Sequence, residues 1–165
     1  MFSKILIPSD GSALGNISAL RGIEMAAKHG AEVVCINVLR EYQKPGFGSK
    51  FNPTQAEFEA EVKAAGVKVL QALEKAAAMA GVKYTGILRS ANHTALAITR
   101  AADEYASDLI FIGSHGCAGW DHVLMGSVSN KVLATAKIPV LIYRLKEDEV
   151  PDEVPHSYES YFPSA

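Results

Sequence analysis

Hydrophobic residues in this chain gather into five short runs that are separated by longer segments with helical spacing. The runs lie at residues 4–8, 32–38, 82–88, 109–112 and 139–143, and their lengths are typical of buried strands. The segments between them repeat apolar residues every three or four positions, as amphipathic helices do. Five strands that alternate with four helices predict an α/β fold, a three-layer α/β/α sandwich around a parallel sheet.

Several helix boundaries carry their own signals. Residues 9–12 (Ser-Asp-Gly-Ser) are typical of a turn that leads into a helix, and Gly30 is typical of a helix end. Thr54 and Glu57 fit a capping box at the start of a long helix that should end at Gly81. The predicted buried face of that helix is Phe58, Val62, Ala65, Val69, Leu73, Ala76 and Ala80. Further helices are expected at 94–105 and 129–136, and residues 39–53, rich in Gly and Pro, predict a surface loop.

A stretch of glycines joins the fourth strand to the fourth helix. Gly113, Gly116, Gly126 and Ser127 fit the pattern G-x2-G-x9-G-S. Glycines let a backbone approach a ligand closely, and the free N–H groups at a helix start attract anions. A Walker P-loop is excluded because G-K-[ST] occurs nowhere in the sequence. Phosphate would be held by backbone N–H groups and by the hydroxyls of Ser127 and Ser129; alternatively, these serines only cap the helix.

Asp10 is the candidate polar partner of this stretch. In open α/β sheets ligands bind beyond the carboxyl ends of the strands, where the chain order reverses. If the first and fourth strands are neighbours there, Asp10 and Gly113 face one crevice. Asp10 would accept hydrogen bonds from a ribose or help to hold a metal; alternatively, it caps its own turn. His115 and Asp10 as an acid/base pair are disfavoured, because no nucleophile or metal-ligand partner stands at motif spacing.

Charge separates the chain into a body and a tail. The formal net charge is −2, but residues 146–165 hold six acidic residues and one lysine, so residues 1–145 carry about +3. We expect one domain at 1–145 and an acidic, aromatic tail at 146–165. The tail is either disordered or docks its aromatic residues on the body or on a partner subunit. The mild positive charge suits a small anionic ligand, whereas nucleic-acid binding requires a concentrated Lys/Arg face.

Location and redox chemistry follow from simple counts. No apolar run approaches the length of a membrane span, so we expect no membrane association and a cytoplasmic protein. The two cysteines, Cys35 and Cys117, are far apart and form no C-x-x-C pair. They are interpreted as buried or incidental thiols.

The residues quoted above resemble a known family. Residues 5–12 are similar to the first-strand signature of universal stress proteins, and the glycine pattern meets the nucleotide motif of their single-domain, ATP-binding subgroup. The resemblance covers most of residues 3–145. It implies a sheet of order 3-2-1-4-5, nucleotide between strands 1 and 4, and a homodimer that pairs the fifth strand, residues 139–145, with its symmetry mate.

The resemblance also implies a set of ligand contacts. Asp10 and the backbone of Pro8 and Val38 match positions that meet adenine and ribose, so the resemblance favours Asp10 as a ligand contact over Asp10 as a cap. Beside the sugar lie Ile112 and Gly113. The positions that match phosphate contacts are Gly116, Gly126, Ser127, Val128 and Ser129. The implied ligand is ATP, or ADP or AMP, with Mg²⁺ as the companion of a triphosphate.

Three features depart from the family pattern. Residues 90–93 stand where a Gly-x-Pro turn is common, Asn37 replaces a frequent His, and the tail has no counterpart. None of them affects the phosphate motif. The expected function is a nucleotide-dependent stress-response or signalling module with an unidentified protein partner, which works by binding rather than fast turnover. The alternatives are a nucleotide-free dimeric interaction module and an enzyme, either a slow ATPase or a nucleotidyl transferase.

Overall fold

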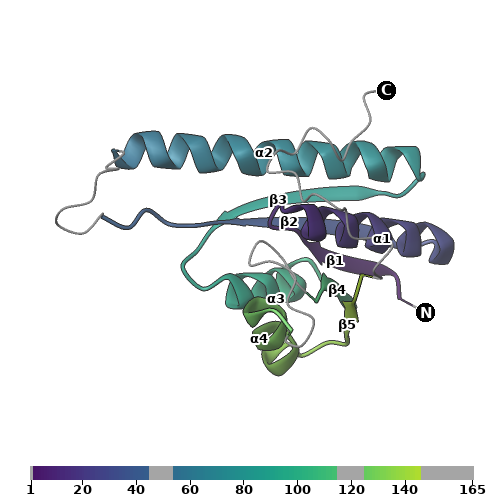
Figure 1. Cartoon of the computed structure of the whole chain (residues 1–165). Coiled ribbons are helices and arrows are strands. Elements are labelled where there is room, and N and C mark those ends of the chain that lie inside the picture. The colour runs from purple at the N-terminus through teal and green to yellow at the C-terminus, as the bar shows by residue number, and fades with distance from the viewer. Residues whose placement is uncertain (1, 45–53, 115–124, 146–165) are drawn as a thin grey trace.

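The computed structural model describes residues 2–44, 54–114 and 125–145. Strands and helices alternate through this part of the chain, as predicted (Figure 1). The elements are β1 (Lys4–Pro8), α1 (Ala13–His29), β2 (Glu32–Leu39), α2 (Gln55–Met79), β3 (Tyr84–Ser90), α3 (Thr94–Glu104), β4 (Leu109–Gly113), α4 (Ser127–Thr135) and β5 (Val140–Tyr143).

The strands form one parallel sheet in the order β3-β2-β1-β4-β5. Helices α1 and α2 cover one face, and α3 and α4 cover the other (Figure 1). This arrangement confirms the predicted three-layer sandwich, its strand order and the edge position of the third strand. Parallel strands have both faces covered, which explains why their sequences are apolar runs rather than alternating patterns.

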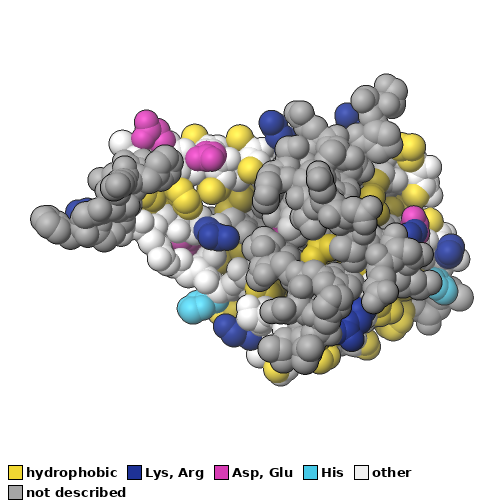
Figure 2. Space-filling model, viewed as in Figure 1, with side chains coloured by type: hydrophobic (Ala, Val, Ile, Leu, Met, Phe, Trp, Pro, Cys, Tyr) yellow, Lys and Arg dark blue, Asp and Glu magenta, His cyan; other side chains and the backbone are white. Residues whose placement is uncertain are grey.

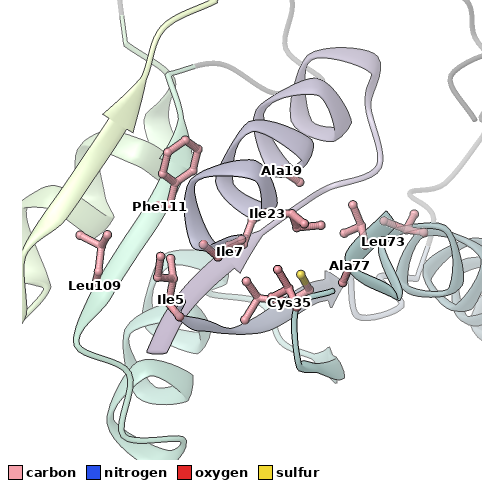
Figure 3. Close-up of a cluster of buried hydrophobic side chains, with 14 residues drawn as sticks. Ile5, Ile7, Ala19, Ile23, Cys35, Leu73, Ala77, Leu109 and Phe111 are labelled. Carbon is pink, nitrogen blue, oxygen red and sulfur yellow. The ribbon is translucent and has the colours of Figure 1, made fainter. Parts of the chain in front are cut away.

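Two cores lie on opposite faces of the sheet because successive side chains of a strand alternate between the faces. On one face Ile5, Ile7 and Phe111 pack against Ile23 of α1 and Leu73 of α2 (Figure 3). On the other face the core consists of Leu6, Val34, Ile36, Ile87, Ala95, Ile98, Ala101, Ala102, Ile110, Ile112 and Val132. The second core includes Ile36, Ile98 and Ile112, which also take part in the site described below.

The end signals predicted for the first two helices are confirmed. Ser12 accepts a hydrogen bond from the Gly15 N–H at the start of α1, and Gly30 ends that helix with a φ of 65°, which glycine adopts without strain. Thr54 and Glu57 form the capping box of α2. Gly81, with a φ of 67°, follows the end of α2.

Helix α2 buries a different set of residues from the one predicted. Val69 and Leu73 are buried as expected, but Gly66 and Ala77 are buried as well, whereas Ala80 is exposed. The helix lies so close to the sheet at Gly66 that an added Cβ would stand 2.6 Å from Leu88 Cδ1 and 2.7 Å from Leu39 Cδ2. A glycine thus occupies a position with no room for a side chain, which a search for large apolar residues overlooks.

Smaller differences concern element ends. The third strand begins at Tyr84 instead of Val82, and the fourth helix begins at Ser127 instead of Ser129. The predictions for residues 45–53 of the loop and for the tail at 146–165 lie outside the described residues. Within the described part of the loop, Tyr42 packs edge-on against Phe58, with ring centroids 5.7 Å apart.

Candidate functional site

A pocket of about 170 Å³ lies at the carboxyl ends of β1, β2 and β4. The strand order reverses here, because β2 flanks β1 on one side and β4 flanks it on the other. The β1–β4 ladder ends at Leu6 and Ile110, although β1 continues to Pro8 and β4 to Gly113. The two strands therefore diverge toward the pocket, at the position where open α/β sheets bind ligands.

The pocket collects most of the residues predicted from the sequence. Nine of the ten line it: Pro8, Asp10, Val38, Ile112, Gly113, Gly126, Ser127, Val128 and Ser129. The tenth, Gly116, lies outside the described residues, as do His115 and Cys117. The structure thus brings together segments from β1, β2, β4 and α4, and their role as ligand contacts stays a prediction.

Five lining residues were not predicted: Ser9, Gly15, Ile36, Thr94 and Ile98. Two of them had a signal in the sequence. Ile36 precedes Val38 by two positions and therefore shares its face of the strand, and Ser9 directly precedes Asp10. Thr94 and Ile98 had none, because only the folded chain shows that the start of α3 lies beside the end of β2.

Asp10 lines the pocket and also accepts hydrogen bonds within its own turn. Its exposed carboxylate lines the pocket, and Oδ1 accepts hydrogen bonds from the Ser12 N–H at 3.0 Å and the Ser12 hydroxyl at 2.6 Å. Ser12 in turn caps α1. A Cβ on Gly15 would lie 2.4 Å from Asp10 Oδ1. Gly15 therefore provides the space in which the carboxylate sits.

A buried polar network fixes the turn that carries Asp10. The Ser9 hydroxyl donates to Asn16 Oδ1 at 2.9 Å, and Asn16 Nδ2 donates to the Gly11 carbonyl at 3.1 Å. From β2, Asn37 Nδ2 donates to the Ser9 carbonyl at 2.9 Å. Ser9, Asn16 and Asn37 are at most 5% exposed. Because buried polar groups are costly to leave unpaired, these bonds hold the turn in one conformation.

The start of α4 presents free backbone donors to the pocket. Its N-cap is Gly126, which has no side chain to cap the helix. The first amide bonded within the helix is that of Asn130, which donates to the Gly126 carbonyl at 3.0 Å. The N–H groups of Ser127, Val128 and Ser129 therefore lack intrahelical acceptors, as the first turn of any helix does. Such a group of donors, at the positive end of the helix dipole, favours an anion.

The two serines of α4 differ in what they offer. The Ser129 hydroxyl is buried and donates to the Gly113 carbonyl at 2.7 Å, which joins α4 to the end of β4. A hydroxyl has one hydrogen, so a phosphate contact from Ser129 would come from its backbone N–H. The Ser127 side chain is exposed and lines the pocket. Neither serine is the N-cap, which corrects the capping alternative.

The backbone of Val38 points into the pocket. In a strand, the peptide groups of alternate residues point to the same side. The Ile36 carbonyl accepts from the Ser9 N–H at 3.0 Å, on the β1 side. The N–H and C=O of Val38 point the same way, beyond the end of β1 at Pro8. Val38 therefore offers an adjacent donor and acceptor that no strand of the described sheet pairs.

Ionisable groups are few at this site. Asp10 is the single ionisable side chain among the described residues that line it. Within residues 2–44, 54–114 and 125–145, no three metal-ligating side chains cluster. Burial raises the pKa of the Cys35 thiol, so this cysteine is the inert core residue that the sequence predicted. On the face shown in Figure 2, lysine and arginine side chains of the described part are spread out rather than gathered in one patch.

The helices of the described part are too short or too polar to cross a membrane.

Comparison with curated proteins gives relatives that match along nearly the whole chain. Universal stress protein MJ0531 of Methanocaldococcus jannaschii is 31% identical over 90% of this chain and 86% of its own. Universal stress protein YxiE of Bacillus subtilis is 32% identical over 87% of this chain and its entire length.

Solved structures share the fold. Hypothetical protein MJ0577 superposes with a TM-score of 0.71 at 27% identity, covering 89% of this chain and 99% of its own. A universal stress protein in complex with cAMP has a TM-score of 0.64 at 21% identity, covering 86% and 97%. One from Archaeoglobus fulgidus in complex with dAMP has a TM-score of 0.60 at 18% identity, covering 85% and 96%. The model of the universal stress protein family matches residues 1–144. This chain therefore belongs to the universal stress protein family.

Proposed function

We propose that this protein binds an adenine nucleotide, ATP in the first place with ADP and AMP as alternatives, and serves as a nucleotide-dependent stress-response or signalling module. The observation that carries the proposal is that two sets of unpaired backbone groups lie on opposite sides of one pocket. The free amides of α4 lie on the β4 side, and the outward peptide groups of Val38 lie on the β2 side.

These backbone groups would orient the ligand. Phosphates belong at the amides of Ser127, Val128 and Ser129 because those donors favour negative charge. The base then lies on the β2 side, where Ile36, Val38 and Ile98 provide an apolar lining. An adenine edge carries a ring nitrogen that accepts and an amino group that donates, which complements the N–H and C=O of Val38. Asp10, after β1 in the centre, is positioned for the ribose hydroxyls.

The solved structures with cAMP and dAMP support this choice of ligand class, since both are adenine nucleotides. At 21% and 18% identity these structures establish only a shared fold. The proposal of an adenine nucleotide therefore rests on the pocket of this chain. The proposal includes Mg²⁺ as an ion bound to the triphosphate, because proteins commonly bind this cation together with the phosphates of a ligand.

The first test is calorimetric titration of the purified protein with ATP, ADP and AMP, with and without Mg²⁺, together with analysis of the nucleotide that denaturation releases. We expect released adenine nucleotide or a saturable heat with at least one ligand. Neither signal from any of the three would contradict the proposal and favour the nucleotide-free interaction module. A turnover number of about 1 s⁻¹ or more with ATP would instead favour an enzyme.

The phosphate donors are tested by two substitutions at one residue. Ser127→Pro removes the N–H and the hydroxyl, yet proline suits the first position of a helix, and Gly126 before it already has the extended ψ of 145° that proline requires. Ser127→Ala keeps the N–H and serves as the control. We expect Ser127→Pro to weaken ATP binding about tenfold or more and to weaken adenosine binding little. Equal affinities of both variants for ATP would place the phosphates elsewhere.

The remaining parts of the proposal concern assembly and location. β5 is an edge strand whose four residues are half-buried, and it pairs with β4 alone in the described sheet. Just before it, the Pro139 carbonyl accepts from the Ile110 N–H at 3.0 Å. We infer that a second copy pairs with the free side of β5, in residues 139–145, and that the dimer works in the cytoplasm through a protein partner that responds to nucleotide.

A further inference from the structure

Thr94 places a hydroxyl at the end of the pocket that otherwise consists of apolar side chains. It is the first residue of α3 and lines the pocket together with Ile36, Val38 and Ile98. Its side chain is half-buried, and its hydroxyl has no hydrogen-bond partner among the described residues. A threonine hydroxyl that no described protein group engages can hydrogen-bond a ligand that enters the pocket.

The position of Thr94 is fixed by its surroundings. α3 starts immediately after a turn in which the Ala91 N–H donates to the Leu39 carbonyl at 3.1 Å. The first helical bond runs from the Ala97 N–H to the His93 carbonyl at 3.0 Å, and Ile98, one turn on, is 1% exposed in the core. The N-cap, His93, makes no capping bond through its side chain. Thr94 therefore stands on a rigid helix, and its hydroxyl is not used to start that helix.

The other polar side chains near this end are already used. The Ser9 hydroxyl donates to Asn16, and the amide of Asn37 donates to the Ser9 carbonyl. The exposed hydroxyl of Ser127 lies on the opposite side, at the start of α4. Among the described pocket-lining residues, Thr94 is therefore the side-chain hydroxyl available to a group bound against Val38.

We propose that Thr94 is a specificity-determining residue whose hydroxyl hydrogen-bonds the edge of the base that Val38 leaves open. The inference rests on the proposed function, in which Val38 takes the ring nitrogen and one amino hydrogen of adenine. The open edge then carries N7, which accepts, and the second amino hydrogen, which donates. A threonine hydroxyl both donates and accepts, so it suits this edge and ties recognition to adenine.

The test is the affinity of three ligands for the wild type and for Thr94→Val, which replaces the hydroxyl with a methyl group of similar size. The ligands are ATP, 7-deazaadenosine triphosphate, which lacks N7, and purine riboside triphosphate, which lacks the amino group. With ATP we expect Thr94→Val to weaken binding about threefold to tenfold. With at least one analogue the loss should shrink below about twofold, because the partner atom is already absent.

Thr99→Val is the matched control. Thr99 lies on the same helix, outside the pocket lining, and its hydroxyl donates to the Leu96 carbonyl at 3.2 Å. The Thr99→Val substitution should leave the affinities for all three ligands unchanged. An equal loss with all three ligands, or no loss with ATP, would overturn the role of Thr94. Failure of the wild type itself to bind ATP would instead count against the proposed function, so the two results are distinguishable.

Discussion

Gly15 determines, at the scale of single residues, whether the Asp10 carboxylate can keep its place in the pocket. A methyl group there would come within 2.4 Å of Asp10 Oδ1 and 3.0 Å of the Ser12 hydroxyl. Gly15→Ala should therefore displace the carboxylate and weaken ATP binding about tenfold, or 1.4 kcal/mol. The higher helix propensity of alanine should offset part of the strain that the methyl group causes at the Ser12 cap. Calorimetric titration and thermal unfolding measure the two effects separately.

Ser18→Ala provides the control on the same helix. The Ser18 hydroxyl is buried and has no hydrogen-bond partner in the described part of the chain, and Ser18 does not line the pocket. Its removal should leave ATP affinity unchanged and should not lower the melting temperature. Wild-type affinity in Gly15→Ala would mean that the orientation of Asp10 does not contribute to binding.

Helix α2 illustrates how close packing is achieved at the scale of elements. At Gly66 an added Cβ would lie within 2.7 Å of Asn37 Oδ1 and of the ends of Leu39 and Leu88. We expect Gly66→Ala to lower the free energy of unfolding by about 1 to 2 kcal/mol, because overpacking outweighs the gain in helix propensity. That loss corresponds to a melting temperature lower by about 3 to 6 °C.

Ala64→Gly calibrates this measurement. Ala64 is an exposed residue of the same helix, so its change to glycine reports propensity alone and should cost about 1 kcal/mol. If Gly66→Ala proved more stable than the wild type, the helix would have room to move away from β2 and β3. Denaturant unfolding of both variants and the wild type decides the matter.

Element order and helix ends could be predicted from the sequence because their causes are local. Gly30 ends α1 through its own backbone freedom, and Thr54 caps α2 through a residue three positions away. Gly66 and Thr94 could not be found in this way, since their roles depend on which distant strand lies opposite them. The second role of Asp10, as a bond acceptor for Ser12, was among the alternatives that local chemistry left open.

At the scale of the whole molecule, Asp108 joins the start of β1 to the start of β4. Its carboxylate accepts from the Ser3 N–H at 2.8 Å, the Ser3 hydroxyl at 2.7 Å and the Lys4 N–H at 3.0 Å. Partial burial raises the pKa of Asp108, but these hydrogen bonds lower it more, so the net pKa lies below its ordinary value of 3.8. The ionised form is therefore favoured in the folded protein.

Replacement of Asp108 should make the loss of stability depend on pH. Because the pKa of Asp108 is lowered in the folded protein, its carboxylate contributes its full stabilisation above the ordinary pKa. This contribution disappears as the pH falls through the pKa of the folded state. Asp108→Asn should cost about 1 kcal/mol at pH 7, given the solvent near the site, and less at pH 3. Urea unfolding at both pH values measures this, and a difference that stays constant between them would contradict the assignment.

The outward peptide groups of Val38 have a consequence for how the family changes over time. A main-chain N–H and C=O are present in every residue except proline, which lacks the N–H, so a contact made through them leaves the side chain at position 38 free to vary. What must persist is the length of β1, because continued pairing of residues 9–11 with β2 would cover those groups. Under the proposed function, members of the family would keep their ligand preference by keeping the relative lengths of β1 and β2. A search for invariant side chains does not detect this feature.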